Sequence, residues 1–135
     1  MLYIYRLSNW AYRRGIPVMP RLLYALNRIL FAVVLPPGVQ VGKDVLFGYS
    51  GLGIVIHARC KIGNRVKIGT NVTLGGRGDI YEVPTIEDDV IIGTGAKVLG
   101  SVVIGRGARI GANAVVLSNV APGTTVVGIP ARAIK

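Results

Sequence analysis

The sequence predicts an all-β fold, a parallel β-helix of hexapeptide repeats, and two regularities carry the prediction. An aliphatic residue returns at every sixth position across most of the chain after residue 55, a spacing that suits neither an α-helix nor a simple alternating strand. A glycine often follows this aliphatic residue, and glycine adopts the positive φ of sharp turns without steric cost. The recurring aliphatic residues are Ile56, Ile62, Ile68, Leu74, Ile86, Ile92, Val98, Ile104, Ile110 and Val116.

The residue two places before most of these aliphatic positions is also small or β-branched. Each unit therefore predicts a short strand whose first and third side chains point inward and whose middle side chain points outward, as in Val66-Lys67-Ile68. Three strands and three corners make one coil of about 18 residues, and stacked coils bury an aliphatic column. The residues at the second inward position are Cys60, Val66, Val72, Val90, Ala96, Val102, Ala108 and Ala114.

Two segments interrupt the repeat. The frame slips between Phe47 and Ile56, in the run GYSGLG, whereas the stretch GGRGDIYEVPT between Leu74 and Ile86 keeps the frame but not the pattern. Irregular loops on a rigid scaffold often carry function, although insertions can also be simply tolerated. We therefore expect the chemistry of the protein near these two loops.

The N-terminal part of the chain follows a different pattern. Apolar residues recur at helical spacing in segments 2–14 and 20–34, and the run GIP separates the two segments. We expect two short helices that cap the first coil. The chain therefore divides into residues 1–37, a helical cap or membrane-contact segment, and residues 38–135, the β-helix.

The chain is strongly basic, with a formal net charge of +10. Five arginines precede residue 36, and Asp44 is the first acidic residue. No nucleic-acid-binding motif accompanies these charges, so we expect no nucleic-acid partner. Residues 1–35 are candidates for peripheral contact with an anionic membrane, and packing as a plain cap is the equal alternative.

Cysteine content and hydropathy indicate the compartment. The single cysteine, Cys60, excludes an internal disulfide and a multi-cysteine metal site, so we expect a cytoplasmic protein without a metal. Its inward position predicts a buried, inert thiol. The apolar stretch 22–35 is too short to cross a bilayer and has no signal-peptide cleavage pattern.

Several phrases give the repeat region a recognisable likeness: GIVIHARCKIG, VTLGG, IIGTGAKVLG with IGANAVVL, and the closing GIPAR. Residues 41–135 resemble the hexapeptide-repeat acetyltransferases, and within them the serine acetyltransferase-like group. The resemblance implies a left-handed coil, a homotrimer, and acetyl-CoA bound as acetyl donor in a cleft between subunits. Apolar residues at outward strand positions also fit a subunit contact. These are Ile91, Val103 and Val115.

Two departures from the enzymes that the chain resembles predict the acceptor. The first is that the long helical N-terminal domain of those enzymes corresponds here to only about forty residues, and the second is a missing pair of histidines. Those enzymes have a catalytic histidine, preceded by an aspartate, just before the GIV phrase, and a second histidine in the loop after VTLGG. The corresponding positions here are Tyr49-Ser50 and residues 79–83, which contain no histidine. A hydroxyl-bearing, aromatic lining suits a sugar, so we predict a saccharide acceptor in surface polysaccharide biosynthesis, bound by Tyr49 and Ser50. L-Serine is the alternative acceptor, and a non-catalytic structural trimer is the second alternative.

Acetyl transfer to an alcohol calls for a general base, because the hydroxyl proton is held too tightly at neutral pH. His57 is the only histidine and is our candidate, although a lone histidine is equally often structural. Asp79 and Glu82 are candidates to orient its ring from an adjacent subunit, although solvated loop residues are the more ordinary interpretation. The backbone N–H groups of Gly75 and Gly76 are candidate oxyanion donors.

Small residues at one corner predict the cofactor site. With about 18 residues per coil, Gly76, Thr94 and Ala112 would stack along one edge, with Pro130 beyond them, and leave room for the thin pantetheine arm of CoA. Basic side chains near that edge would bind its phosphates, although small corner residues also satisfy turn geometry alone. The candidate cofactor residues are Gly75, Gly76, Arg77, Thr94, Gly95, Lys97, Ala112, Arg132 and Lys135.

Overall fold

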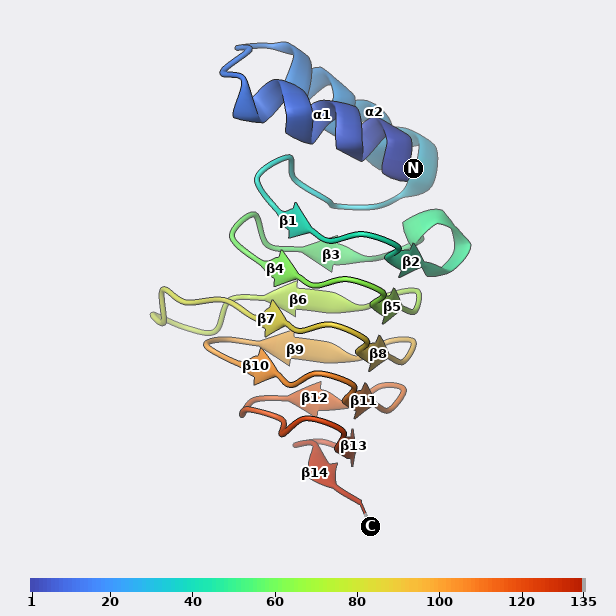
Figure 1. The fold of residues 1–135 in the computed structure, drawn as a ribbon, viewed down its shortest axis with the longest axis vertical. Helices are drawn as coiled ribbons and strands as arrows, with labels where there is room; N and C mark the ends of the chain where they lie inside the picture. Colours follow the sequence, from blue (N-terminus) through green and yellow to red (C-terminus); the bar gives the residue numbers. More distant parts are fainter. Residues whose placement is uncertain (135) are drawn as a thin grey trace.

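A pair of helices and a three-sided coil of short strands make up the chain (Figure 1). The computed structural model describes residues 1–134. Helices α1 and α2 lie across one end of the coil, and the strands stack in successive turns toward the other end. The helices are α1 (Leu2–Arg13) and α2 (Met19–Phe31), and the strands are β1 (Gln40–Val41), β2 (Leu46–Phe47), β3 (Val55–Ile56), β4 (Lys61–Ile62), β5 (Lys67–Ile68), β6 (Thr73–Gly75), β7 (Thr85–Ile86), β8 (Ile91–Ile92), β9 (Lys97–Leu99), β10 (Val103–Ile104), β11 (Arg109–Ile110), β12 (Val115–Val116), β13 (Thr125–Val127) and β14 (Arg132–Ala133).

The strands form three faces. The β1 face contains β1, β4, β7 and β10, the β2 face contains β2, β5, β8, β11, β13 and β14, and the β3 face contains β3, β6, β9 and β12. Within residues 1–134 the paired strands run parallel except β13 and β14, where Val126 lies opposite Ala133 in antiparallel register. This topology confirms the parallel β-helix that the hexapeptide spacing predicts.

The aliphatic residues of the repeat fill the interior of the coil. All ten residues of the sixfold series are at most 4% exposed, and the second inward series is equally buried. Each fully buried aliphatic side chain contributes about 1.5–3 kcal/mol by the hydrophobic effect. The core is therefore a continuous column of Ile, Val, Leu and Ala, as predicted.

The register between coils is not uniform. Ile92 pairs with Ile110, which lies one predicted coil length further along the chain. Ile68 pairs with Ile92, and this coil exceeds the predicted length because it contains the loop after β6. Phe47 pairs with Ile68, and this coil is also longer than predicted because of the segment after β2. The two interruptions seen in the sequence thus leave the core in register and project outward.

The two predicted N-terminal helices are present, and polar contacts hold them to the first coil. Tyr5 is buried in α1, and its hydroxyl donates to the Val39 carbonyl. Ser8 Oγ donates to the Pro20 carbonyl at 2.9 Å, which joins α1 to the first turn of α2. Helix α2 ends at Phe31, earlier than predicted, because Ala32 adopts left-handed φ and ψ and turns the chain into the coil.

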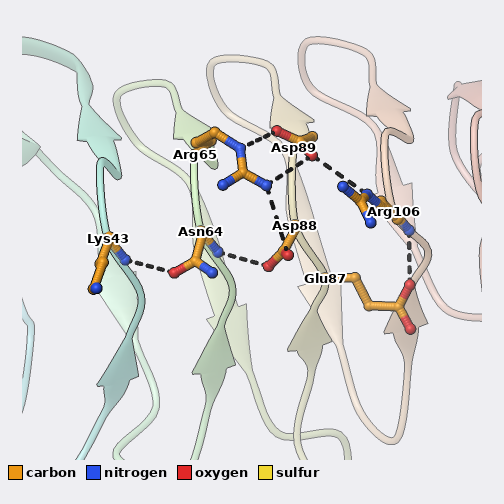
Figure 2. Close-up of polar contacts among 7 residues, drawn as sticks. All are labelled: Lys43, Asn64, Arg65, Glu87, Asp88, Asp89 and Arg106. Carbon is orange, nitrogen blue, oxygen red and sulfur yellow. Dashed lines mark hydrogen bonds and ion pairs between the residues drawn. The ribbon is translucent and has the colours of Figure 1, made fainter.

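Side chains at the corner between the β1 and β2 faces form a ladder across successive coils (Figure 2). Asn64 Oδ1 accepts a hydrogen bond from the backbone N–H of Lys43 at 2.7 Å, and Asp88 Oδ1 accepts one from the backbone N–H of Asn64 at 2.8 Å. Glu87 Oε2 accepts from the backbone N–H of Arg106 at 2.8 Å. Each side chain thus satisfies a turn N–H of a neighbouring coil, which would otherwise lack a partner.

Two absences hold for the part of the chain that the structure describes. Neither helix combines the length and the apolar character that crossing a bilayer requires. No group of three or more His, Cys, Asp or Glu side chains comes together where it could hold a metal ion.

Candidate active site

The first irregular segment is η1 (Gly48–Gly51), at the corner between the β2 and β3 faces. Tyr49 and Ser50 have positive φ values of 48° and 56°, which non-glycine residues adopt at a steric cost. Both side chains are exposed, and Tyr49 is 87% exposed. The backbone of this segment therefore directs outward from the coil the side chains of the two residues predicted to bind the acceptor.

His57 lies at the other edge of the β3 face, where the chain turns from β3 toward β4. Its backbone N–H donates to the Leu74 carbonyl at 2.8 Å, which fixes the turn to the next coil. Its ring Nδ1 accepts a hydrogen bond from the backbone N–H of Arg59 at 3.1 Å. A neutral ring in this arrangement carries its proton on Nε2, so Nε2 is a donor in the single chain.

The second irregular segment, residues 76–84, projects from the same corner as His57. Arg59 joins its own turn to this loop, because its guanidinium lies 3.9 Å from the centroid of the Tyr81 ring. The same guanidinium donates to the Tyr81 carbonyl at 2.5 Å. At the base of the loop, Arg77 Nη1 donates to the Leu117 carbonyl at 3.3 Å. The loop is therefore attached to the coil at both places.

Asp79 and Glu82 lie in this loop, and both side chains are exposed. Within residues 1–134 neither forms a hydrogen bond or ion pair with His57. A single chain thus brings the loop and His57 to one corner without joining their side chains. Tyr49 and Ser50 lie at the opposite edge of the β3 face.

A cleft of about 520 Å³ opens beside the loop, between α1, the first coils and residues 81–83. Ala58 and Arg59, the two residues that follow His57, line it, whereas His57 itself does not. The cleft carries charges of both signs. Its polar and aromatic lining includes Tyr12, Arg59, Lys61, Tyr81, Glu82 and Thr85.

Sequence reasoning missed Arg59, Lys61 and Tyr81 as site residues. Arg59 and Lys61 flank the inward Cys60 in the sequence. Their position next to the single histidine was a usable signal. No signal in the sequence indicated the contact between Arg59 and Tyr81, because it joins residues from different coils through an irregular loop.

The candidate cofactor residues separate into two edges of the β3 face. Thr70, Thr94 and Ala112 stack at the corner between the β2 and β3 faces, because Gly95 N–H donates to the Thr70 carbonyl and Asn113 N–H donates to the Thr94 carbonyl. Lys97 Nζ donates to the Asn71 carbonyl at 2.6 Å near this edge. This edge therefore combines small corner residues with a basic side chain.

The predicted column of Gly76, Thr94 and Ala112 is wrong in one member. Gly75 lies level with Leu99, so Gly76 and Arg77 belong to the opposite edge of the β3 face. The error arose because the coil that contains the loop is longer than the repeat predicts, as the pairing of Ile68 with Ile92 shows. Pro130 also falls out of the column, because Ile110 pairs with Val126 and the last coil is therefore shorter than predicted.

Of the two C-terminal candidates, Arg132 lies on β14, next to β13 at the end of the β2 face. Arg132 is exposed on β14, and its guanidinium donates to the Ala131 carbonyl at 3.0 Å. Lys135 lies outside the described residues.

Cys60 follows the turn that contains His57 and Arg59, and its side chain is fully buried. Burial raises the pKa of the Cys60 thiol to about 12, because the interior disfavours the thiolate. The nucleophilic form is therefore suppressed at neutral pH. The predicted buried, inert thiol is confirmed.

Known proteins resemble both the repeat and the whole chain. Residues 84–118 match the family described as "Bacterial transferase hexapeptide (six repeats)". The serine acetyltransferase of Helicobacter pylori strain J99 is 40% identical over 135 residues, which cover 98% of this chain and 78% of the relative. The chain belongs to the serine acetyltransferase family.

Two further members of the family define the extent of the likeness. The serine acetyltransferase of Synechococcus elongatus is 42% identical, and the match covers 98% of this chain but 55% of the relative. The serine acetyltransferase from Brucella abortus, solved in complex with coenzyme A, has a TM-score of 0.94 at 32% identity and covers 98% of this chain and 54% of that one. The likeness confirms the left-handed β-helix, and this chain spans about half the length of these two relatives.

The family relationship overturns the predicted saccharide acceptor and the role in polysaccharide biosynthesis. Relatives that are 40% and 42% identical over 98% of this chain are named serine acetyltransferases. The saccharide prediction depended on Tyr49 and Ser50, which replace an aspartate and a histidine of the resembling enzymes. A hydroxyl-bearing lining does not identify the acceptor, because it can bind an amino acid as well as a sugar.

Proposed function

We propose that the chain transfers the acetyl group of acetyl-CoA to the hydroxyl of L-serine. Membership of the serine acetyltransferase family is the observation that carries this proposal. In the reaction, the serine Oγ attacks the thioester carbonyl carbon, the C–S bond breaks, and the CoA sulfur leaves and takes up a proton. The products are O-acetylserine and CoA.

The charges of the cleft support an amino-acid acceptor. Serine carries a carboxylate and an ammonium group, so its binding site benefits from fixed charges of both signs. Arg59 and Lys61 can bind the carboxylate, and Glu82 can bind the ammonium group, all from the lining of one cleft. Arg77 and Asp79, which lie in the same loop, are not among its lining residues.

His57 is the proposed general base. It can accept the serine proton at Nε2 only after the ring proton moves to Nδ1, where the backbone N–H of Arg59 now donates. A carboxylate that accepts from Nδ1–H would stabilise this tautomer. Asp79 and Glu82 of an adjacent subunit remain the proposed orienting residues, and for Glu82 this role is the alternative to binding the serine ammonium group. The N–H groups of Gly75 and Gly76 remain the proposed oxyanion donors.

A homotrimer would complete the proposed site. The edge with Thr94, Gly95 and Lys97 and the edge with His57 lie on opposite sides of the β3 face in one chain. A neighbouring subunit would place the first edge of one chain against the second edge of another, which provides two walls for acetyl-CoA. Arg77 and Arg132 are then proposed to bind its phosphates. We place this reaction in the cytoplasm, where the thiol of Cys60 stays reduced.

The deciding experiment incubates the purified chain with acetyl-CoA and L-serine. Release of CoA thiol is followed together with formation of O-acetylserine by mass spectrometry. L-Alanine is the matched control, because it has the same charges and lacks the hydroxyl. We expect product with serine and no thiol release with alanine.

The second candidate function is a non-catalytic trimer that binds acetyl-CoA. The observation that favours it is the occupied Nδ1 of the single histidine. Acetyl-CoA would then raise the unfolding temperature of the chain by mass action. It would not be consumed when L-serine is also present. That result would overturn the proposed transfer reaction and support the second candidate.

A further inference from the structure

The outward side of α1 is apolar although nothing in residues 1–134 covers it. Its buried residues are Tyr5, Ser8 and Ala11, of which Tyr5 contacts the first coil and Ser8 contacts α2. Tyr3, Leu7 and Trp10 follow one another at helical spacing on the other side of the helix. Tyr3 is 91% exposed, and Leu7 and Trp10 are each 47% exposed. An exposed stripe of this kind on a surface helix indicates an interaction surface.

Helix α2 repeats this arrangement. Its buried residues are Pro20 and Asn27, and its exposed stripe consists of Leu22, Leu26 and Ile29 at the same spacing. Ile29 is 81% exposed, and Leu22 is 64% exposed. The two stripes lie opposite the buried sides of their helices, so they face away from the coil. We call these six residues the outer cap face.

Basic side chains accompany the outer cap face. Arg6 donates to the carbonyls of Val41 and Gly42 and so belongs to the attachment of the cap to the coil. The other four arginines of the cap are exposed, and none forms an ion pair within residues 1–134. These four are Arg13, Arg14, Arg21 and Arg28.

Arg14 places one of these positive charges next to the apolar stripe of α1. Its guanidinium lies 5.2 Å from the centroid of the Trp10 ring. Tryptophan and arginine together suit the interface between lipid headgroups and acyl chains, where the ring is partly buried and the cation remains hydrated. On α2, Arg21 and Arg28 lie on one flank of the apolar stripe, two turns apart.

We propose that the outer cap face binds the surface of an anionic lipid membrane. The apolar stripes would enter the boundary between headgroups and acyl chains, and the four arginines would meet anionic headgroups. Charge complementarity selects this occupant. A second copy would bring two sets of unpaired arginines together, and such like-charge contact is unfavourable.

The test uses the whole chain and vesicles of phosphatidylcholine, alone or mixed with phosphatidylserine. We expect the chain to float with the mixed vesicles at low salt, and we expect high salt to release it. Trp10 is the only tryptophan, so its fluorescence reports directly on this face. A blue shift with the mixed vesicles alone is expected when its ring leaves water.

Two double variants distinguish binding through the outer cap face from binding through the overall basic charge of the chain. Arg21→Gln with Arg28→Gln removes two charges from the cap, and Lys67→Gln with Arg109→Gln removes two charges from the β2 face. Each arginine near an anionic surface favours partitioning by a factor of about 5, so the cap pair should weaken binding roughly 30-fold. The β2-face pair should bind like the unmodified chain. Circular dichroism verifies that both variants remain folded.

A third variant tests the apolar stripe, because Leu22→Ser with Ile29→Ser keeps every charge. We expect it to abolish the fluorescence shift of Trp10. Three results would overturn the proposal. One is the absence of flotation with mixed vesicles, and another is equal weakening by both charge pairs. The third is self-association of the unmodified chain that the serine variant abolishes, which would identify the face as a contact between copies.

Discussion

Arg65 Nε donates to Asp89 Oδ1 at 2.7 Å, although the two residues belong to adjacent coils. Arg106 approaches the other carboxylate oxygen, Oδ2, at 3.4 Å from the next coil (Figure 2). The hydrogen bond from Arg65 and the nearby charges of Arg65 and Arg106 lower the pKa of Asp89 below its usual value. One carboxylate thus joins three successive coils.

This arrangement predicts a pH-dependent contribution to stability. A carboxylate whose pKa is lowered in the folded state contributes fully above its unfolded pKa, about 3.9. The contribution is lost as the pH falls through the lower folded value. We expect Asp89→Asn to lower the thermal midpoint slightly at neutral pH and to match the unmodified chain in strong acid. Thermal melts across the acidic range measure the difference, and a constant difference at all pH values would contradict the prediction.

The proposed base is tested by His57→Ala. A general base contributes about 10²- to 10⁴-fold to turnover, so we expect kcat to fall by about 100-fold or more. Acetyl-CoA binding, measured by thermal stabilisation, should change little, because the imidazole is assigned to the acceptor proton. A variant that retains most of its turnover would make His57 structural and direct attention to Asp79 or Glu82.

The contact between Arg59 and Tyr81 predicts an effect on the acceptor. Arg59→Lys keeps the charge but loses the flat guanidinium that stacks on the ring and reaches the carbonyl. We expect the KM for L-serine to rise severalfold with a smaller change in kcat. Arg109→Lys, on the outer side of β11, is the matched control and should leave both constants unchanged. An equal response of the two variants would show that the contact does not shape the site.

Alanine substitutions at two corner glycines distinguish the cost of a steric clash from the cost of backbone strain. Both Gly95 and Gly107 have positive φ, of 78° and 72°. A Cβ at Gly95 would lie 2.0 Å from Asn113 Oδ1, whereas a Cβ at Gly107 would meet nothing within 4 Å. Gly107→Ala should therefore cost about 1–2 kcal/mol from the left-handed backbone alone.

Gly95→Ala should cost clearly more, because Asn113 must also move. Urea unfolding of the two variants gives both free energies. Equal losses would mean that Asn113 yields freely and that only the backbone conformation matters.

The sequence identifies the coil because each inward position is a local property. Ile62, Ile92 and Ile110 are recognised by their spacing and by the turn residues beside them, without knowledge of any distant partner. The helices of the cap follow from the same kind of local periodicity. Their boundaries depend on Ala32, whose left-handed conformation no local pattern indicates.

The candidate site is less accessible to such reasoning because its contacts cross irregular segments. Counting residues past the loop assigned Gly76 to the edge of Thr94, and the added residues of that coil moved it to the other edge. Arg59 meets Tyr81 through a loop conformation that the repeat does not determine. The acceptor was misassigned because the identities of Tyr49 and Ser50 indicate the chemical character of the surface they line, which does not determine which molecule binds there.

The antiparallel return of β14 has a consequence for the solution behaviour of the coil. A stack of parallel turns has unpaired backbone groups on its last turn, which are a template for adding another chain and so for growth of a fibre. Here Arg132 and Ala133 fold back on β13 in the opposite direction and occupy part of that template. The helical cap covers the other end of the stack. This antiparallel return therefore disfavours the parallel, in-register addition of another coil at this end of the β2 face.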